Sequence, residues 1–394
     1  MAVEQTTPVN GRPQLPRAVW LVSWTSFFTD TASETVYPLM PLYLTKVLGG
    51  SALSIGVIEG LAEALNSILK ILAGQWSDRL GARKRLMIAG YALSSAVRPL
   101  VALVSSWTQV LGVRLADRVG KGLRGAPRDA LIAHWVEPSN RGYAFGVNRA
   151  MDHTGAVVGP VLATVFLWFY PGQYRTLFAL TLIPGLFAVL MLLPVPDVHV
   201  PAPQARAAGL APAPLGVPLR RYFGVLLLFS LGNSTDAFLL LRLGDAGVSG
   251  TWIPLTWAAL HVVKATVSPI GGYLSDRISR KSMIILGWAI YAAVYAAFAW
   301  VTSVPALLAV FLVYGLYYGL TEGVEKAVVA DLAPAEARGY AFGVHGAISG
   351  IGALLASLIF GAIWKVAGAP AAFLTGAALA MLATVLLFRQ KLAR

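Results

Sequence analysis

The sequence contains no cysteine and few charged residues. Without cysteine, the chain has no disulfide, no thiolate metal site and no cysteine nucleophile. Charged residues make up only 12% of its 394 residues, whereas 57% are hydrophobic and the mean hydropathy is +0.68. So little charge, combined with long apolar runs, is typical of a chain that lies in a lipid bilayer. The composition therefore predicts an integral membrane protein.

The sequence also lacks the motifs of common catalytic centres. It has no His-x-x-x-His or Glu-x-x-His spacing for zinc and no Gly-x-Ser-x-Gly nucleophile turn. The glycine-rich stretch at 120–125 lies inside a predicted helix, which is not the context of a phosphate-binding loop. Residues 1–17 contain no apolar core before a small-residue cleavage site, so we expect no signal peptide. We predict no enzymatic activity and no cofactor.

Apolar runs of about 20 residues, which suffice to cross ~30 Å of hydrocarbon, occur twelve times. They begin near Ala18, Ala52, Arg85, Trp107, Tyr143, Thr176, Leu219, Thr251, Ser282, Val304, Gly339 and Ala371. Six lie on each side of a proline-rich segment that cannot be helical. We predict an all-α membrane protein with a six-helix bundle at 1–193, a linker at 194–218 and a second six-helix bundle at 219–394.

The heptapeptide Arg-Gly-Tyr-Ala-Phe-Gly-Val occurs at 141–147 and again at 338–344, a spacing of 197 residues. The pattern Gly-x-x-x-Asp-Arg occurs at 74–79 and at 272–277, a spacing of 198 residues. Two anchors in almost one register indicate a duplicated chain. Residues that both copies share are expected to serve the scaffold, and residues that differ are candidates for function.

The positive charges indicate how the chain crosses the membrane. Most Lys and Arg residues outside the apolar runs lie on the side that holds both termini, and the opposite loops hold only Lys46, Arg175, Arg242 and Lys365. By the positive-inside rule, both termini and the linker are cytoplasmic, as expected for a multi-pass protein of the plasma (inner) membrane. Because the basic residues are dispersed over short loops beside apolar helices, the net charge of +13 reflects topology and predicts no nucleic-acid partner.

Ionisable residues inside the apolar segments are unevenly distributed. At membrane depth each costs on the order of 3 kcal/mol, so it is expected to face the bundle interior or a watery cavity. The third, sixth, ninth and twelfth segments contain only Arg98 among them and are expected to face lipid. The first, fourth, seventh and tenth hold Asp30, Glu34, Arg114, Asp117, Arg118, Lys121, Arg124, Asp236, Glu322, Glu325 and Lys326.

The segment 74–85, Gly-Gln-Trp-Ser-Asp-Arg-Leu-Gly-Ala-Arg-Lys-Arg, resembles the signature loop between helices 2 and 3 of the major facilitator superfamily. Its second copy at 272–281 is looser, with Ser279 where glycine is usual. The resemblance covers essentially the whole chain and implies a twelve-helix transporter that acts as a monomer in lipid on a small molecule or ion. In that family helices 1, 4, 7 and 10 line a central cavity and helices 3, 6, 9 and 12 lie outside, which agrees with the distribution of ionisable residues.

The signature loop is expected to act as a latch. Asp78 would accept hydrogen bonds from N–H groups at a neighbouring helix start or from an arginine such as Arg141, while basic neighbours contact lipid headgroups. An ordinary polar loop with topological charges is the alternative. The predicted gating residues of the two copies are Asp78, Arg79, Arg141, Asp276, Arg277 and Arg338.

The apolar segment that begins near Trp107 carries an unusual stripe of charge. Residues spaced 3, 4, 3 and 4 apart share one helical face: Arg114, Asp117, Lys121, Arg124 and Arg128. Arg118-x-x-Lys121-Gly122 resembles the Arg-x-x-Gln-Gly pattern of proton-coupled antiporters in the superfamily, with lysine in place of glutamine. The stripe predicts substrate binding or coupling. The alternative is that Asp117 and the bases neutralise one another and the acids of the first helix, and so only fix the bundle.

The next segment contains Gly155-x-x-x-Gly159-Pro160, which resembles the antiporter motif of exporters in the superfamily. Ala163 stands where a further glycine is common. Small residues at this spacing let two helices approach closely, and a proline allows bending. The motif favours export over import, with plain helix packing as the alternative.

Comparison of the two halves indicates which kind of solute the protein carries. At a shift of 197 residues, Lys121 corresponds to Tyr318, Arg124 to Thr321, Gly125 to Glu322 and Arg128 to Glu325. One basic and one more acidic wall would suit a polar or zwitterionic organic solute, or an anion held by the basic helix. Asp30, Glu34 and Asp236 are predicted as proton carriers or substrate contacts. Asp152 and His153 are a further candidate proton site, whereas Glu59, Glu63, His261 and Lys264 are expected to tie the two halves together.

Other cargoes stay open. His153, His261 and His345, with carboxylates, would suit a divalent metal ion, although seven methionines and no cysteine argue against copper. A proton-coupled importer of a metabolite and a receptor-like member that does not transport are further alternatives. We predict a secondary transporter that exports a small polar or charged organic solute by alternating access, driven by protons.

Overall fold

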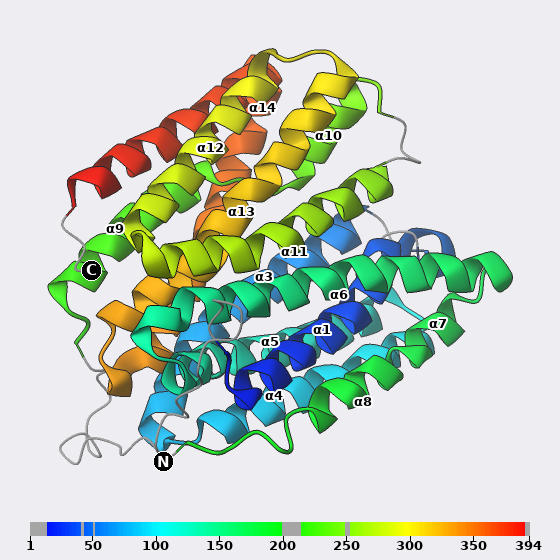
Figure 1. The fold of residues 1–394 in the computed structure, drawn as a ribbon. Helices are drawn as coiled ribbons and strands as arrows, with labels where there is room; N and C mark the ends of the chain where they lie inside the picture. Colours follow the sequence, from blue (N-terminus) through cyan, green and yellow to red (C-terminus); the bar gives the residue numbers. More distant parts are fainter. Residues whose placement is uncertain (1–13, 41–42, 50–51, 199–213, 249–252, 391–394) are drawn as a thin grey trace. The chain divides into compact units, whose positions relative to one another are not determined.

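The computed structural model of the protein describes residues 14–40, 43–49, 52–198, 214–248 and 253–390. Every regular element within these ranges is a helix (Figure 1). In chain order the α-helices are α1 (Arg17–Val36), α3 (Ala52–Leu80), α4 (Arg83–Val97), α5 (Trp107–Trp135), α6 (Arg141–Phe169), α7 (Tyr174–Leu180), α8 (Leu182–Leu190), α9 (Val217–Gly232), α10 (Ala237–Asp245), α11 (Ile253–Arg277), α12 (Arg280–Trp300), α13 (Val304–Leu332) and α14 (Arg338–Arg389). Short helical turns are η1 (Tyr37–Leu39), η2 (Tyr43–Val47), η3 (Arg98–Leu103), η4 (Pro138–Asn140) and η6 (Ala335–Ala337).

Three of these helical rods are interrupted. Thr181 separates α7 from α8, and non-helical residues at 233–235 precede α10. Within α14 the chain kinks at Gly368, whose φ of 84° and ψ of 169° are not helical. A glycine followed two residues later by Pro370 accounts for this kink, because only glycine adopts such angles without strain. The twelfth predicted segment therefore exists as the part of α14 that follows the kink.

The predicted segment starts agree with the observed helices. The first eleven lie within two residues of the start of a helix, and the twelfth, near Ala371, comes three residues after the kink at Gly368. By length and apolar composition alone, six helical segments of the described ranges are able to cross a membrane: 83–103, 138–169, 217–245, 280–300, 304–332 and 335–389. The charged helix α5 is not among them, because its stripe makes it too polar to face lipid on every side.

The chain divides into two compact units. Unit 1 comprises 1–136, 151–213 and 335–344, and unit 2 comprises 137–150, 214–334 and 345–394. Each unit therefore includes the first residues of a helix, α14 or α6, whose remainder belongs to the other unit. The exchanged residues include both copies of the repeated heptapeptide. The predicted domain boundaries at 1–193, 194–218 and 219–394 stay a prediction, and residues 199–213 of that linker lie outside the described residues.

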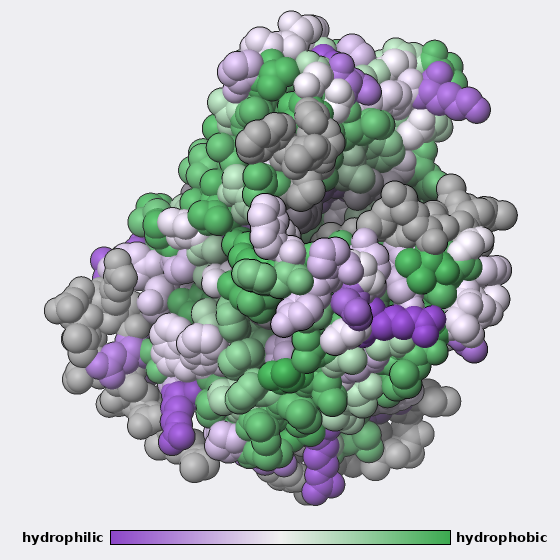
Figure 2. Space-filling view, turned by 90° about the vertical axis from the view of Figure 1, so that its right-hand side faces the viewer, coloured by the Kyte–Doolittle hydropathy of each residue, from purple (hydrophilic) through white to green (hydrophobic). Residues whose placement is uncertain are grey.

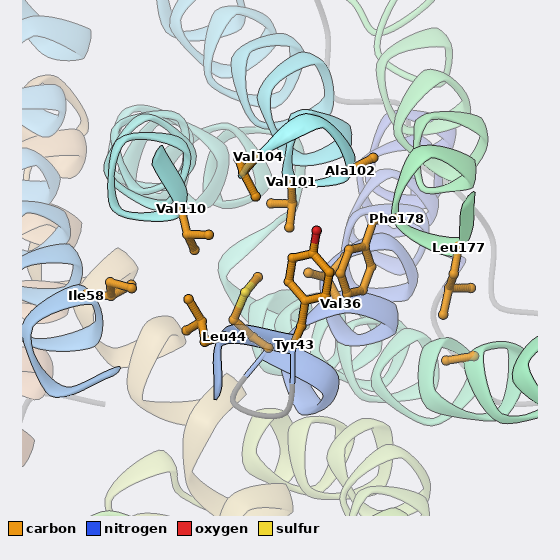
Figure 3. Packing of buried hydrophobic residues seen from close by; sticks show 12 residues of the cluster. Val36, Tyr43, Leu44, Ile58, Val101, Ala102, Val104, Val110, Leu177 and Phe178 are labelled. Atoms are coloured by element: carbon orange, nitrogen blue, oxygen red, sulfur yellow. The ribbon is translucent and has the colours of Figure 1, made fainter. Parts of the chain in front are cut away.

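A cluster of apolar side chains closes one region of unit 1 (Figure 3). Val36, Leu44 and Val101 are at most 3% exposed, and the rings of Tyr43 and Phe178 meet edge to face at 5.1 Å. The cluster joins α1, η2, α3, η3, α5, α6 and α7, so it fixes parts of these elements relative to one another. The charged side chains of α5 therefore extend from a packed scaffold.

Apolar side chains also cover much of the outside. In the face shown in Figure 2 they form broad areas that hydrophilic residues interrupt only in places. Large exposed apolar residues are frequent on α8 and α14, among them Ile183, Leu186, Leu358 and Leu386. α8 belongs to the sixth predicted segment and the part of α14 after Gly368 to the twelfth, and both segments were expected to face lipid. A surface of this kind is stable only when lipid or another apolar surface covers it.

Candidate functional site

Asp78, two residues before the end of α3, binds the start of α14 within unit 1. Its Oδ1 accepts the Gly339 N–H at 3.0 Å and its Oδ2 accepts the Tyr340 N–H at 2.7 Å. N–H groups in the first turn of a helix have no partner inside the helix, and the helix dipole favours an anion there. Arg83 completes the arrangement, since its Nη2 lies 2.7 Å from Asp78 Oδ1 and donates to the Ala335 carbonyl at 2.8 Å. One carboxylate thus joins the α3–α4 loop to a helix start from the other half of the sequence.

Asp276 repeats this arrangement within unit 2. Its Oδ1 accepts the Gly142 N–H at 2.9 Å and its Oδ2 accepts the Tyr143 N–H at 2.8 Å, both at the start of α6. Arg280 lies 3.0 Å from Asp276 Oδ1 and also donates to the Pro138 carbonyl. We name the two arrangements the Asp78 latch (Asp78, Arg83, Gly339 and Tyr340) and the Asp276 latch (Asp276, Arg280, Gly142 and Tyr143).

Backbone N–H groups at a helix start bind both latch aspartates, which is one of the two kinds of partner expected for Asp78. Arg83 and Arg280, each from the helix that follows, also contact them, and a contact of Arg141 or Arg338 with these aspartates stays a prediction. Arg141 donates to Asp331 at 2.6 Å, and the same carboxylate accepts from Arg280 Nε at 2.7 Å. Asp331 enlarges the Asp276 latch, whereas His134 holds the corresponding position in the first half.

The other predicted gating residues lie beside the latches. Arg79 directly follows Asp78, and Arg338 is the first residue of α14. The Arg277 guanidinium lies 4.1 Å from the centre of the Tyr273 ring. The gating role of these three arginines stays a prediction.

The glycines of the repeated heptapeptide lie where helices approach most closely. A Cβ on Gly339 would lie 2.7 Å from Asp78 Oδ1, and a Cβ on Gly343 would lie 2.5 Å from the Lys70 carbonyl oxygen. The glycines of α6 face backbone carbonyls of α11 in the same way, Gly142 that of Gly272 and Gly146 that of Ser268. Real Cβ atoms do not approach so closely, so only glycine allows each helix start to lie against its partner.

The loops of the two latches differ by one residue. The two arginines are 197 residues apart, whereas the two aspartates are 198 apart. In the longer loop Gly81 has a left-handed φ of 59°, while in the shorter loop Ser279 is extended. The shorter loop needs no left-handed residue, so serine replaces the usual glycine without strain.

The charged stripe of α5 contains a buried ion pair. Asp117 lies 3.0 Å from Arg98 of η3 and 3.9 Å from Arg118. Arg98 also donates to the Thr29 carbonyl of α1 at 3.3 Å. Asp117 and Arg98 are only 4% and 5% exposed. This geometry favours a structural role for Asp117, which is the alternative that the sequence left open.

Two arginines of the stripe also pack against neighbouring aromatic rings. Arg124 donates to Ser94 Oγ at 2.5 Å, and its guanidinium lies 4.5 Å from the centre of the Tyr91 ring on α4. The Arg114 guanidinium lies 5.4 Å from the centre of the Tyr37 ring. Guanidinium groups are attracted to ring faces, so these contacts stabilise both side chains at their buried positions.

Asp152 and His153, the candidate proton site, are buried on α6. Asp152 lies 3.9 Å from Arg128, which also lies 3.0 Å from Asp129 and donates to Ser26 of α1 at 3.1 Å. Arg128 therefore links α5 to α1 and lies next to the predicted proton site.

Asp30 and Glu34 on α1 face the basic side of α5. Asp30 interacts electrostatically with Lys121 and Asp152, and Glu34 interacts with Lys121 and Arg118. Lys121 is the exposed member of the stripe, whereas Asp30 and Glu34 are half-buried. Acids and bases that are near one another but reachable from outside are able to exchange protons or bind a charged solute.

The glycines of the antiporter-like motif bring α6 against α1. A Cβ on Gly155 would collide with the Phe27 carbonyl, and a Cβ on Gly159 would lie 2.6 Å from the Thr31 carbonyl oxygen. Thr35 Oγ1 donates to the Gly159 carbonyl at 3.2 Å. This close approach has the geometry expected from the small-residue spacing, and it fixes the part of α1 that carries Asp30.

Unit 2 holds a second polar cluster at the interruption between α9 and α10. Asp236 Oδ1 accepts from the Tyr314 hydroxyl at 2.7 Å and from the Tyr318 hydroxyl at 2.9 Å. Lys264 Nζ lies 3.4 Å from Asp236 Oδ2, 3.4 Å from the centre of the Tyr318 ring and 5.3 Å from that of Trp257. We name these five residues the Asp236 cage. Lys264, which was expected to tie the two halves together, instead pairs with Asp236 inside unit 2, because two tyrosines of α13 hold that carboxylate within its reach.

Known proteins match this chain over most of its length. The model of the Major Facilitator Superfamily matches residues 22–263 and 243–393. An uncharacterised MFS-type transporter of Methanocaldococcus jannaschii is 33% identical over 380 residues, which are 95% of each chain. The chain belongs to the major facilitator superfamily. A multidrug resistance protein MdtH of Aeromonas hydrophila is 23% identical over 329 residues, 81% of each chain. Among solved structures, the human organic anion transporter MFSD10 has the same fold, with a TM-score of 0.79 at 19% identity over 95% of this chain and 100% of that chain.

Membership in the major facilitator superfamily confirms the predicted fold and class. The protein is a multi-pass membrane transporter with the superfamily's all-helical fold, and it is not an enzyme. The resemblance that rested on the loop at 74–85 is therefore correct.

Glu325, a predicted site residue of this MFS chain, is held by neighbours inside unit 2. Trp288 Nε1 donates to Glu325 Oε1 at 3.0 Å, and His345 Nε2 lies 3.5 Å from Oε2. Glu325 is 8% exposed, while Glu322, one turn earlier, is half-buried. Glu322 is therefore the more accessible of the two acids.

The histidines proposed for the metal alternative lie in different surroundings. His153 belongs to unit 1, whereas His261 and His345 belong to unit 2, where His261 packs on Trp257 with ring centres 4.8 Å apart. Within the described residues no group of three or more His, Asp or Glu side chains is arranged to hold a metal ion.

Four charged residues were missing from the predicted site. Arg83 and Arg280 complete the latches, and the repeat held a signal for them, since they correspond at the spacing of 197. Arg98 also carried a signal, as the only ionisable residue in a set of otherwise uncharged segments. Asp331 had none, because its partners are Arg280 and Arg141, 51 and 190 residues away.

Proposed function

We propose that this transporter exports a small polar or charged organic solute across the inner membrane in exchange for protons, by alternating access. In this proposal the protein is a monomer with both termini in the cytoplasm. The observation that carries it is the group formed by Asp30, Glu34 and Lys121 in unit 1, two acids and an exposed base that interact within segments expected from the sequence to cross the membrane. Groups of this kind are costly in a membrane and mark substrate or proton pathways.

Export is supported by the close packing of Gly155 and Gly159 on α1. These glycines belong to the motif that resembles the antiporter motif of exporters, and they adjoin the carrier candidate Asp30. The name of the multidrug resistance protein of Aeromonas hydrophila also agrees with export.

The latches support alternating access. Each consists of a carboxylate on N–H groups at a helix start, which stabilises the conformation in which the two elements are in contact. Release of the latches would let the chain change conformation around a site near the membrane centre.

The proposal is tested by flux through the purified protein in liposomes, with a panel of radiolabelled organic cations, anions and zwitterions. We expect an imposed pH gradient to accelerate the flux of at least one solute against no gradient. Arg118→Ala and Asp30→Asn should each remove this acceleration. Lys365→Ala, at an exposed position on α14, is the control and should behave as wild type.

Each part of the proposal has its own contradicting result. Flux that does not respond to the pH gradient would exclude proton coupling, and acceleration only in the inward direction would exclude export. If the Asp30→Asn variant keeps full proton coupling, Asp30 is not the proton carrier, and Glu34 and Asp152 are the remaining candidates.

A further inference from the structure

In the Asp236 cage the lysine ammonium lies farther from the carboxylate than the two tyrosine hydroxyls do. Lys264 Nζ is 3.4 Å from Asp236 Oδ2, whereas charge-assisted bonds from an ammonium to a carboxylate are usually about 2.7–2.9 Å. The two tyrosine hydroxyls approach the same carboxylate more closely, at 2.7 and 2.9 Å. The carboxylate is therefore positioned by Tyr314 and Tyr318, and the lysine occupies the space that they leave.

The surroundings of that space have the chemistry of a site for an organic cation. The Lys264 ammonium faces the rings of Tyr318 and Trp257 as well as the carboxylate. Aromatic faces carry negative electrostatic potential, and ring faces around a carboxylate recognise primary and quaternary ammonium groups. An anion in the same place would meet the ring faces and Asp236, which both repel it.

Asp236 is also the reachable side of the pair. Its side chain is 15% exposed, whereas that of Lys264 is 4% exposed. The backbone at Asp236 is not part of a continuous helix, and neighbouring side chains fix the interruption. Ser357 Oγ accepts the Thr235 N–H at 3.0 Å, and the Ser234 and Tyr295 hydroxyls are 3.0 Å apart. Interrupted membrane helices commonly form solute sites, because their free backbone ends are fixed and polar.

We propose that the Asp236 cage binds the ammonium group of the transported solute and that Lys264 occupies the cage as its resident counter-ion when no solute is bound. The inference rests on the proposed transport function and narrows its cargo to amines and quaternary ammonium compounds. Solute and lysine compete for one site. While no solute is bound, the lysine side chain neutralises the Asp236 carboxylate.

The test is binding of three probes with similar rings to the full-length protein in detergent by calorimetry. The probes are benzylamine, benzyltrimethylammonium and benzoate. Lys264→Gln removes the ammonium group that competes with the probe. We therefore expect the Lys264→Gln protein to bind both cations about tenfold more tightly than wild type does. Asp236→Asn should weaken both cations at least tenfold. The single variant Asp236→Asn leaves the lysine charge unpaired and could fold poorly for that reason. The double variant Asp236→Asn with Lys264→Gln has no charge at either position, and we expect this protein also to bind both cations weakly. Lys365→Gln, at an exposed position, is the matched control.

Three results would overturn the proposal. The first is equal cation affinity in wild type and Lys264→Gln. The second is cation binding that does not depend on Asp236. The third is benzoate binding that Lys264→Gln abolishes, which would show an anion site instead.

A flux measurement separates failure of this proposal from failure of the proposed function. Cation binding that depends on Asp236 but is accompanied by no flux would uphold the cage and reject transport of these probes. Flux of a cation that is unchanged in Asp236→Asn would reject the cage and leave the transport function standing.

Discussion

Arg98 illustrates how a single charged residue fits an otherwise apolar segment. It lies in η3 and contacts Asp117 of α5 and the Thr29 carbonyl of α1, so it joins three elements of unit 1. Both members of the ion pair are nearly fully buried. A buried pair adds little over apolar packing while it is intact, but removal of one partner leaves an uncompensated charge.

At the residue scale we therefore expect Arg98→Leu to destabilise the protein by about 3 kcal/mol. The reason is that Asp117 would lose its partner at 3.0 Å and keep cations at longer range, such as Arg118, whose Nη1 lies 3.9 Å away. The measurement is the melting temperature of the purified protein in detergent, with Arg85→Leu as an exposed control. Arg98→Leu combined with Asp117→Leu should recover most of the loss. An unchanged melting temperature in the single variant would show that the pair is not structural.

The heptapeptide repeat acts at the scale of helices. Each copy forms the first two turns of a helix, α6 or α14, and places two glycines against the backbone of α11 or α3. The aspartate of the facing helix binds the free N–H groups of the same turn. The helix start is thus held by close backbone contact and by charge together, which explains why the two copies share these residues while α5 and α13 differ.

A methyl group on Gly339 tests this contact. We expect Gly339→Ala to destabilise the Asp78 latch by about 2 kcal/mol, since the added Cβ would overlap Asp78 Oδ1 and the Gly74 carbonyl. Hydrogen–deuterium exchange at the start of α14 should then become faster. Gly112→Ala is the matched control, because a Cβ at that helical position meets nothing within 4 Å. Equal exchange in the two variants would contradict the role assigned to Gly339.

At the scale of the whole molecule, the two latches share no residue. If the proposed alternating access is correct, we expect them to open together. The cysteine-free sequence makes this measurable, because one introduced cysteine is the only target of a thiol reagent. Ser275 is 3% exposed and would lie beside any Cβ on Gly142 of the Asp276 latch, so its labelling reports release of that latch.

We expect Asp78→Asn to accelerate maleimide labelling of the Ser275→Cys protein about tenfold, although Asp78 belongs to the other latch. Loss of about 1.4 kcal/mol of latch stability corresponds to this factor. The direct variant Asp276→Asn sets the upper limit, and Lys365→Ala, at an exposed position outside both latches, is the control. Labelling that responds to Asp276→Asn but not to Asp78→Asn would mean that the latches open independently.

The membrane class, the helical segments and the duplication followed from the sequence alone. The cost of placing apolar or charged groups in lipid depends on local composition, and a repeat is visible in the letters themselves. The starts of α5 and α6 and the superfamily were therefore predictable. The interruption before Asp236 was not, because it depends on side chains of other helices such as Ser357 and Tyr295.

Only the tertiary structure decided which charges meet. Asp78 binds Gly339 across 261 residues of sequence, Lys264 takes Asp236 rather than a residue of the other half, and Arg98 neutralises Asp117. A charged side chain in a membrane requires a partner, so the sequence determined that partners would exist. Their identity depends on which helix faces come together, and no local pattern contains that information.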